Sequence, residues 1–154
     1  MRRGISFEIP NEYGKFLWEI LEPVDVAAFD WRIGSGETYR VVNDQLDKEL
    51  FLDDKNVIEG RRLKNLLDVN KYYIIFADLQ AFPKNRVARV ETFEEFLESS
   101  CELVLLVVDC SYATIYCKNQ ETIESIHNNA ITWGFESIEY ITAENDPRTR
   151  LSVW

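Results

Sequence analysis

The spacing of apolar residues along the chain predicts several strands. In GISFEI, residues 4–9, Ile5, Phe7 and Ile9 alternate with polar positions, which is typical of a strand with one buried face. The run YYIIFADLQAF, residues 72–82, predicts a long strand that ends at Pro83. LVLLVVD, residues 103–109, is apolar on both parities, so we expect a strand covered on both faces, with YATIYC returning beside it.

Two further pairs of short apolar runs predict hairpins. VAAFDWRI and TYRVV flank Gly34-Ser35-Gly36, which favours a flexible turn between two paired strands. Near the end of the chain, SIEYIT and RLSVW flank Asn145-Asp146-Pro147-Arg148, where proline favours a turn. The polar, acidic stretch 43–54 fits no element clearly.

A helical spacing of apolar residues occurs in four segments. Asn11 is the expected cap of the first helix, which Pro23 stops, and the second helix is expected at 58–68. Thr92 opens a capping box before the third helix, and the fourth begins after Asn119 and ends at Gly134. The residues expected to face inward are Tyr13, Phe16, Leu17, Ile20 and Leu21, then Leu63, Leu66 and Leu67, then Phe96 and Leu97, and finally Ile123, Ile126, Ala130 and Trp133.

A helix followed by one or two strands thus recurs four times along the chain. This order predicts an α+β fold, in which helices pack on one side of a mostly antiparallel or mixed sheet. A doubly wound parallel sheet is the alternative, but the predicted hairpins argue against it. A chain of 154 residues without a linker-like tract is expected to form one domain, residues 1–154.

The opening run RRGISFEIPNEYGKFLWEIL and the closing run FESIEYITAENDPRTRLSVW resemble a family of small proteins from bacilli, classed as a domain of unknown function. The resemblance extends over the full length of the chain. It implies a single intracellular domain, and it supplies no catalytic or binding residues.

All three cysteines lie in the segment CELVLLVVDCSYATIYCK, residues 101–118. The spacings between Cys101, Cys110 and Cys117 fit no zinc motif, and no two of them are expected to face each other. We therefore expect buried, inert thiols, with Cys110 and Ser111 at a hairpin tip. An odd number of cysteines, together with the lack of a secretory apolar segment or a membrane span, predicts a cytoplasmic protein.

Charge is distributed unevenly along the chain. The net charge is −10, yet residues 1–90 carry 15 acidic and 14 basic side chains. Residues 91–146 carry 12 acidic side chains and only Lys118 as a base, and Arg148 and Arg150 follow. An acidic surface of this kind repels nucleic acids and anionic membranes and attracts basic proteins, so the former two are not expected as partners.

The sequence therefore offers a docking face for a basic protein, by analogy with inhibitors or immunity-like proteins. The simpler alternative is a solvated acidic surface that maintains solubility. Trp18, Trp31 and Trp154 are candidate aromatic anchors, although large aromatics are more often core residues. The candidate acidic residues are Glu94, Glu95, Glu98, Glu121, Glu124, Glu136, Glu139, Glu144 and Asp146.

Few chemistries of catalysis are available to this sequence. His127 is the single histidine and lies at the edge of a predicted helix stripe, and neither a G-x-S-x-G motif nor a phosphate-binding glycine loop occurs. Asp78 and Asp109 each end an apolar run. If those strands were parallel neighbours, the two carboxylates could hold Mg²⁺ for hydrolysis or phosphoryl transfer. The simpler explanation is that aspartate favours turns.

No cofactor is predicted, and whether the protein is an enzyme is left open. Two further alternatives concern binding. An apolar pocket for a small ligand leaves no signature in periodicity. Self-association through a strand edge, with RLSVW as the candidate segment, also remains open.

Overall fold

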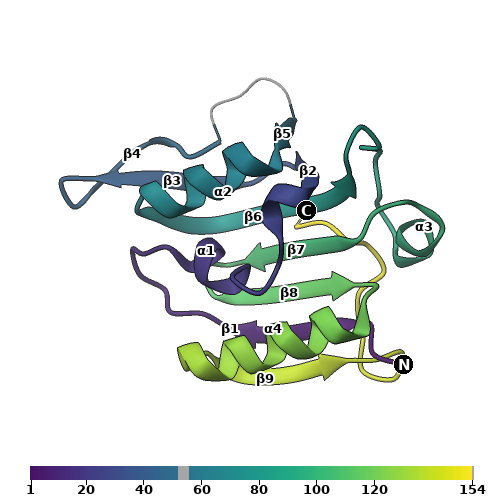
Figure 1. Cartoon of the computed structure of the whole chain (residues 1–154). Coiled ribbons are helices and arrows are strands. Elements are labelled where there is room, and N and C mark those ends of the chain that lie inside the picture. Colours follow the sequence, from purple (N-terminus) through teal and green to yellow (C-terminus); the bar gives the residue numbers. More distant parts are fainter. Residues whose placement is uncertain (52–55, 154) are drawn as a thin grey trace.

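One antiparallel sheet forms the middle layer of the computed structural model, which describes residues 1–51 and 56–153 (Figure 1). Its main strand order is β4-β3-β6-β7-β8-β1-β9, with β2 paired to β6 and to β5. The strands are β1 (Gly4–Glu8), β2 (Phe29–Ile33), β3 (Glu37–Val42), β4 (Gln45–Glu49), β5 (Val57–Glu59), β6 (Tyr72–Pro83), β7 (Leu103–Val108), β8 (Tyr112–Cys117) and β9 (Glu136–Ile141). The α+β class is confirmed. Every strand pairing within the described residues is antiparallel, so the doubly wound alternative is wrong.

Helices cover the sheet on both faces. One face carries α1 (Phe16–Ile20), α2 (Gly60–Val69) and α4 (Gln120–Trp133), and α2 also packs on the short 3-10 helix η1 (Val26–Ala28). Helix α3 (Phe93–Glu98) and the C-terminal segment cover part of the opposite face, so the expectation of helices on one side is wrong for α3. The predicted caps at Thr92, Asn119 and Gly134 are confirmed, and Gly134 has the left-handed φ of 77°.

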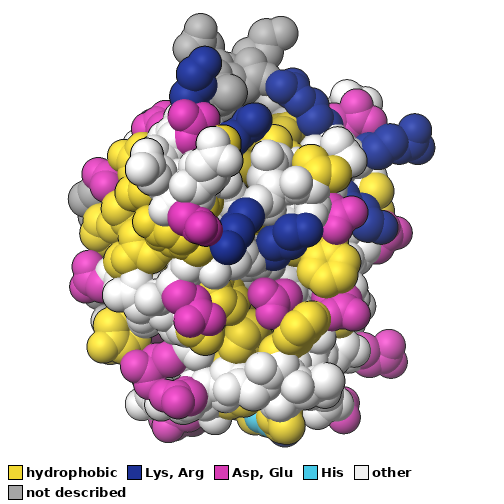
Figure 2. All heavy atoms as spheres, turned by 90° about the vertical axis from the view of Figure 1, so that its left-hand side faces the viewer, with side chains coloured by type: hydrophobic (Ala, Val, Ile, Leu, Met, Phe, Trp, Pro, Cys, Tyr) yellow, Lys and Arg dark blue, Asp and Glu magenta, His cyan; other side chains and the backbone are white. Residues whose placement is uncertain are grey.

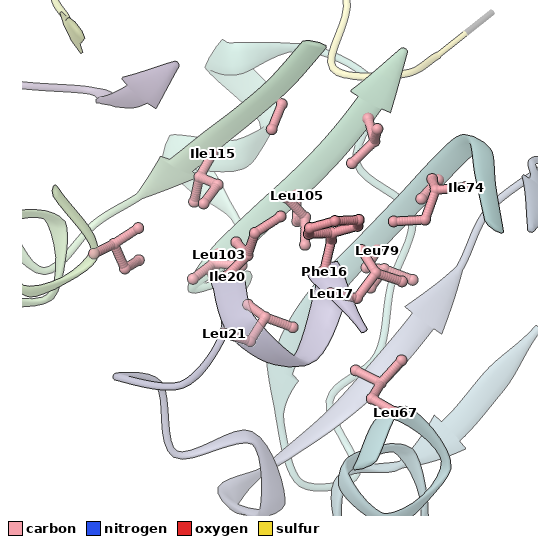
Figure 3. Close-up of a cluster of buried hydrophobic side chains, with 14 of the residues drawn as sticks. Phe16, Leu17, Ile20, Leu21, Leu67, Ile74, Leu79, Leu103, Leu105 and Ile115 are labelled. Carbon is pink, nitrogen blue, oxygen red and sulfur yellow. The ribbon is translucent and has the colours of Figure 1, made fainter. Parts of the chain in front are cut away.

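The larger core lies between the sheet and helices α1, α2 and α4. Figure 3 shows apolar side chains of α1 directed at the sheet. Leu17 is completely buried there, and each such leucine stabilises the fold by about 2 kcal/mol. The labelled members are Phe16, Leu17, Ile20, Leu21, Leu67, Ile74, Leu79, Leu103, Leu105 and Ile115.

A second, smaller core lies on the opposite face of the same strands. Val104 and Leu106 of β7 point into it, whereas Leu103 and Leu105 point into the larger core. The predicted burial of β7 on both faces is therefore confirmed. The covering residues include Phe96 of α3 and Leu151 of the C-terminal segment.

The predicted hairpin between β2 and β3 is wrong. Both strands pair with the same edge of the 12-residue strand β6, where β2 lies opposite residues 79–83 and β3 lies opposite residues 72–76. Gly34-Ser35-Gly36 is thus a break in one edge of the sheet rather than a reversal of the chain. The hairpin partner of β3 is β4, and the turn between them has positive φ at Asn43 and Asp44 (52° and 60°).

Three predictions at the ends of the chain are also wrong. Helix α1 begins at Phe16, five residues after the predicted Asn11 cap, and the side chain of Asn11 instead accepts a hydrogen bond from the Tyr73 hydroxyl. Tyr13 is 37% exposed rather than buried. Residues 150–153 form no strand, so RLSVW is not a strand edge over its described part. Leu151 of this segment is instead buried in the second core.

Two helix residues are more exposed than predicted, and two of the three cysteines are buried as expected. Leu97 and Trp133, both expected inside, are 56% and 42% exposed. Cys101 and Cys117 are buried free thiols, and burial raises the pKa of Cys101 to about 12. Cys110 is half-buried at the β7–β8 turn, where it follows Asp109 as predicted. Among the described helices, none combines the length and the apolar character needed to cross a membrane.

Candidate functional site

The predicted docking residues fall into three separate groups. Glu94, Glu95 and Glu98 lie on α3, Glu121 and Glu124 lie on α4, and Glu136 and Glu139 lie on β9; all are exposed. Helices α3 and α4 cover opposite faces of the sheet, so these carboxylates do not share one continuous face. The acidic last third of the sequence therefore does not form one side of the folded molecule.

Basic side chains lie between α3 and the start of α4. Arg2, Arg3 and Lys118 line a hollow that includes residues of both helices. The Arg3 guanidinium binds Asp146 at 3.1 Å, so this predicted acidic residue is neutralised. These basic side chains therefore separate the glutamates of α3 from those of α4 and weaken their combined negative potential.

The predicted aromatic anchors differ in exposure. Trp31 is fully buried and its indole N–H donates to the carbonyl of Val26 at 2.9 Å, so it is a core residue, which was the favoured alternative, and not an anchor. Trp18 is half-buried against the larger core, beside a hollow that Glu22 and Lys64 also line. Trp154 lies outside the described residues.

Figure 2 shows acidic side chains over the whole of one side of the molecule. Basic side chains accompany them at the top and in the middle of this side, whereas the lowest part, which is the height of α4 and β9 in Figure 1, carries acidic side chains without basic ones. On the sheet face opposite α4, Tyr112, Glu8 and Glu136 lie side by side in the registers of β8, β1 and β9. Ser6 and Glu139 form the next such pair. We call Glu8, Tyr112, Glu136 and Glu139 the β9 surface.

The two aspartates of the metal hypothesis lie apart. Strands β6 and β7 are neighbours, but they are antiparallel, so the parallel arrangement that the hypothesis required is wrong. Asp78 lies within β6 opposite Leu106, whereas Asp109 is in the turn after β7, about 10 Å further along the strand direction. No cluster of three or more potential metal ligands occurs within residues 1–51 and 56–153. Metal binding by Asp78 and Asp109 stays a prediction that this geometry does not favour.

Asp78 instead forms the floor of a cavity of about 350 Å³ on the sheet face opposite α1 and α2. Arg32 and Gln80 lie beside it on β2 and β6, where they are register partners. The walls come from two irregular segments, Arg89 to Glu91 and Arg150 to Ser152. We call this cavity the arginine cleft and define it by Arg32, Asp78, Gln80, Arg89, Glu91 and Arg150.

Positive charge exceeds negative charge around the arginine cleft. Glu91 binds Arg89 at 2.7 Å and lies 3.9 Å from Arg150, so one carboxylate faces two guanidinium groups. Burial raises the pKa of Asp78 to about 6, although Arg32 and Arg148 act in the opposite direction. Three arginines therefore line the cleft and a fourth, Arg148, acts on Asp78, against two carboxylates, of which Asp78 is protonated more easily than usual. This excess occurs in a chain with a net charge of −10.

The break in the sheet edge makes room for the Asp78 carboxylate. A Cβ atom built on Gly34 would lie 2.7 Å from Cγ of Asp78, closer than nonbonded carbon atoms approach. The Gly34 N–H donates to the Asp78 carbonyl at 2.8 Å, which holds the two backbones together at the break. The absence of a side chain at Gly34 thus lets a charged residue occupy a central strand.

Gln80 is the most buried polar residue of the arginine cleft. Its side chain is 4% exposed, and its amide nitrogen donates to the carbonyl of Val90 at 2.8 Å. Its Oε1 atom is buried and has no hydrogen-bond partner within the described part of the chain. This role leaves no signal in the sequence, because Gln80 lies in a run that is typical of an ordinary strand.

Sequence reasoning also missed the arginines. Arg32, Arg89 and Arg150 are far apart in the chain, and no spacing rule links an arginine on a strand with two in irregular segments. A single signal was present: Asp78 is a charged residue inside an otherwise apolar run, and such a residue needs compensating partners when it is buried.

Comparisons with known proteins assign the chain to a protein family. A family model described as "Protein of unknown function (DUF2691)" matches residues 2–152. A relative from Bacillus subtilis (strain 168), "Uncharacterized protein YncE", is 51% identical over 154 residues, which cover 99% of this chain and 100% of the relative. No solved structure matches the chain. The fold and the arginine cleft described above are thus those of a member of the DUF2691 family.

Proposed function

We propose that the protein binds a small anionic ligand in the arginine cleft. The observation that carries this proposal is the surplus of guanidinium groups around one cavity: Arg32, Arg89 and Arg150 line it, and Arg148 acts on its floor. Arginine binds carboxylates and phosphates through two parallel hydrogen bonds, which suits a ligand of this charge. A cavity of about 350 Å³ is large enough for an organic molecule of several carbon atoms.

The form of the cleft supports a binding role over a purely structural one. If the arginines only stabilised the fold, each would be expected to have its own acidic partner, yet Glu91 is shared between Arg89 and Arg150. These two side chains are 71% and 61% exposed, so they are free to turn toward a ligand. The floor is rigid in comparison, because Asp78 and Gln80 belong to a strand paired on both sides.

Calorimetric titration with succinate tests the proposal. We expect saturable binding, and we expect Arg32→Gln and Arg150→Gln each to weaken it about tenfold, since a hydrogen bond between charged groups is lost. Arg61→Gln is the matched control, because Arg61 is an exposed arginine of α2 on the opposite face. Equal affinity in all four proteins, or no heat of binding at millimolar succinate, would refute the proposal.

A second proposal concerns the β9 surface, on which we propose that a basic protein docks. Three carboxylates and the 55% exposed Tyr112 lie on an open part of the sheet, and this combination supports docking by charge complementarity with an aromatic contact. The α3 and α4 glutamates would then contribute to long-range attraction only.

The test begins with salt-sensitive capture from a bacterial extract and continues with the purified captured protein. Glu136→Lys with Glu139→Lys should slow its association and flatten the dependence of that rate on salt. Glu94→Lys with Glu98→Lys, a matched reversal on α3, should have a smaller effect. If the two double variants associate at the same rate as the unmodified protein, the β9 surface is not the docking site.

A further inference from the structure

The orientation of the Gln80 amide is fixed by its surroundings. Its nitrogen faces the carbonyl of Val90, which can only accept a hydrogen bond. The reverse orientation would bring two carbonyl oxygens together. The Oε1 atom must therefore face away from Val90, and Gln80 is one of the residues that line the arginine cleft.

A buried acceptor without a donor is unfavourable, and native proteins contain few of them. Gln80 is 4% exposed and its Oε1 has no donor within the residues that the structure describes. Asp78 adds a second acceptor to the same floor when it is ionised. The floor of the cleft thus offers hydrogen-bond acceptors, whereas its walls offer the guanidinium donors of Arg89 and Arg150.

Resting on the proposed function, we infer that the ligand of the arginine cleft is a small organic anion that also carries a hydroxyl or amino group. The anionic group binds the arginines at the walls. The hydroxyl or amino group donates to Oε1 of Gln80 at the floor. A hydroxycarboxylate and the phosphate ester of a polyol both have this chemistry.

Pairs of probes that differ by one hydroxyl group test this inference. Malate and succinate carry the same charges, and only malate has a hydroxyl group; 2-hydroxypropyl phosphate and propyl phosphate form the corresponding phosphate pair. We expect the hydroxylated member of at least one pair to bind about five- to tenfold more tightly, which is the usual effect of one hydrogen bond to a buried acceptor. Which pair binds better distinguishes a carboxylate from a phosphate ester.

The variant Gln80→Met removes the acceptor and keeps a side chain of similar length. It should abolish the preference for the hydroxylated probe, whereas Arg61→Gln should retain it. In the unmodified protein, the side-chain amide signals of Gln80 in an NMR titration should shift with malate more than with succinate, and this readout requires no variant to fold.

The outcomes separate the two proposals. If both members of each pair bind equally well, the anion site stands and the inference about the hydroxyl or amino group is wrong. A preference that persists in Gln80→Met would show that another group, such as Asp78, accepts the hydrogen bond. If none of the four probes binds, the proposed function itself fails.

Discussion

Gly34 lies so close to Asp78 that a methyl group at residue 34 would overlap the Asp78 carboxyl group, with 2.7 Å between Cβ and Cγ. We therefore predict that Gly34→Ala lowers the free energy of unfolding by about 1–3 kcal/mol, as in other cases of overpacking. Urea denaturation measures this effect. In an Asp78→Ala background the same substitution should cost less than half as much, because the overlapping carboxyl group is gone.

A loss that is equal in both backgrounds would contradict this relationship. It would mean that Gly34→Ala acts through the backbone at the sheet break and not through contact with Asp78.

The raised pKa of Asp78 predicts how stability depends on pH. This pKa is about 6 in the folded protein, compared with its ordinary value of 3.8. The folded state therefore binds the proton more tightly, so the stability associated with protonation is complete below pH 3.8 and is lost as the pH rises through 6. Asp78→Asn should exceed the unmodified protein in stability by up to about 3 kcal/mol at pH 8 and match it near pH 4. Urea denaturation at both pH values tests this, and a constant difference between the two proteins would contradict it.

Ligand affinity should follow the same titration. Asp78 faces Arg32 on β2, Arg148 in the C-terminal segment and the backbone N–H of Val153, with Glu91 on the wall of the same cleft. When the Asp78 carboxylate becomes neutral, less negative charge opposes an anion. Sulfate keeps its charge between pH 5 and pH 8, so its affinity should rise several-fold as the pH is lowered over this range. Asp78→Asn should bind sulfate with little dependence on pH. If both proteins showed the same rise, another group would be responsible.

A partly buried ion pair lies at the start of the segment that carries Arg148 and Arg150. The Asp146 carboxylate accepts hydrogen bonds from Arg3 at 3.1 Å, from the Tyr116 hydroxyl at 2.9 Å and from the backbone N–H of Arg148 at 3.1 Å. Tyr116→Phe removes one donor without changing the ring. It should lower stability by about 1 kcal/mol and increase hydrogen exchange in residues 145–153. It should also weaken succinate binding, although residue 116 does not line the cleft. Unchanged exchange in that segment would contradict this positioning role.

Local pattern predicted the individual elements well. The stripe of Ile123, Ile126 and Ala130 and the doubly apolar run of β7 each have one physical solution, and the structure has it. Pairing between strands was less predictable. Nothing in VAAFDWRI or TYRVV reveals that both runs pair with β6. The twelve residues of β6 are long enough to pair with both along one edge, and neither short run contains that information.

Sites built from distant segments were the least predictable. Counting charge along the chain treated Arg148 and Arg150 as a small correction to the acidic total. In space, Arg150 lines one cavity with Arg32 and Arg89, and Arg148 acts on Asp78 at its floor. The same counting grouped the glutamates of α3 and α4, which the fold separates onto opposite faces of the sheet. Proximity in sequence stands for proximity in space only within one helix or one hairpin.

The most direct test of the anion site is an NMR titration with succinate that follows the Nε–Hε signals of the arginine side chains. We expect the signals of Arg32, Arg89, Arg148 and Arg150 to shift together and saturate with one dissociation constant, while the signal of Arg61 remains in place. If no arginine signal saturates, or if all of them drift in proportion to the added salt, the arginine cleft is not a binding site.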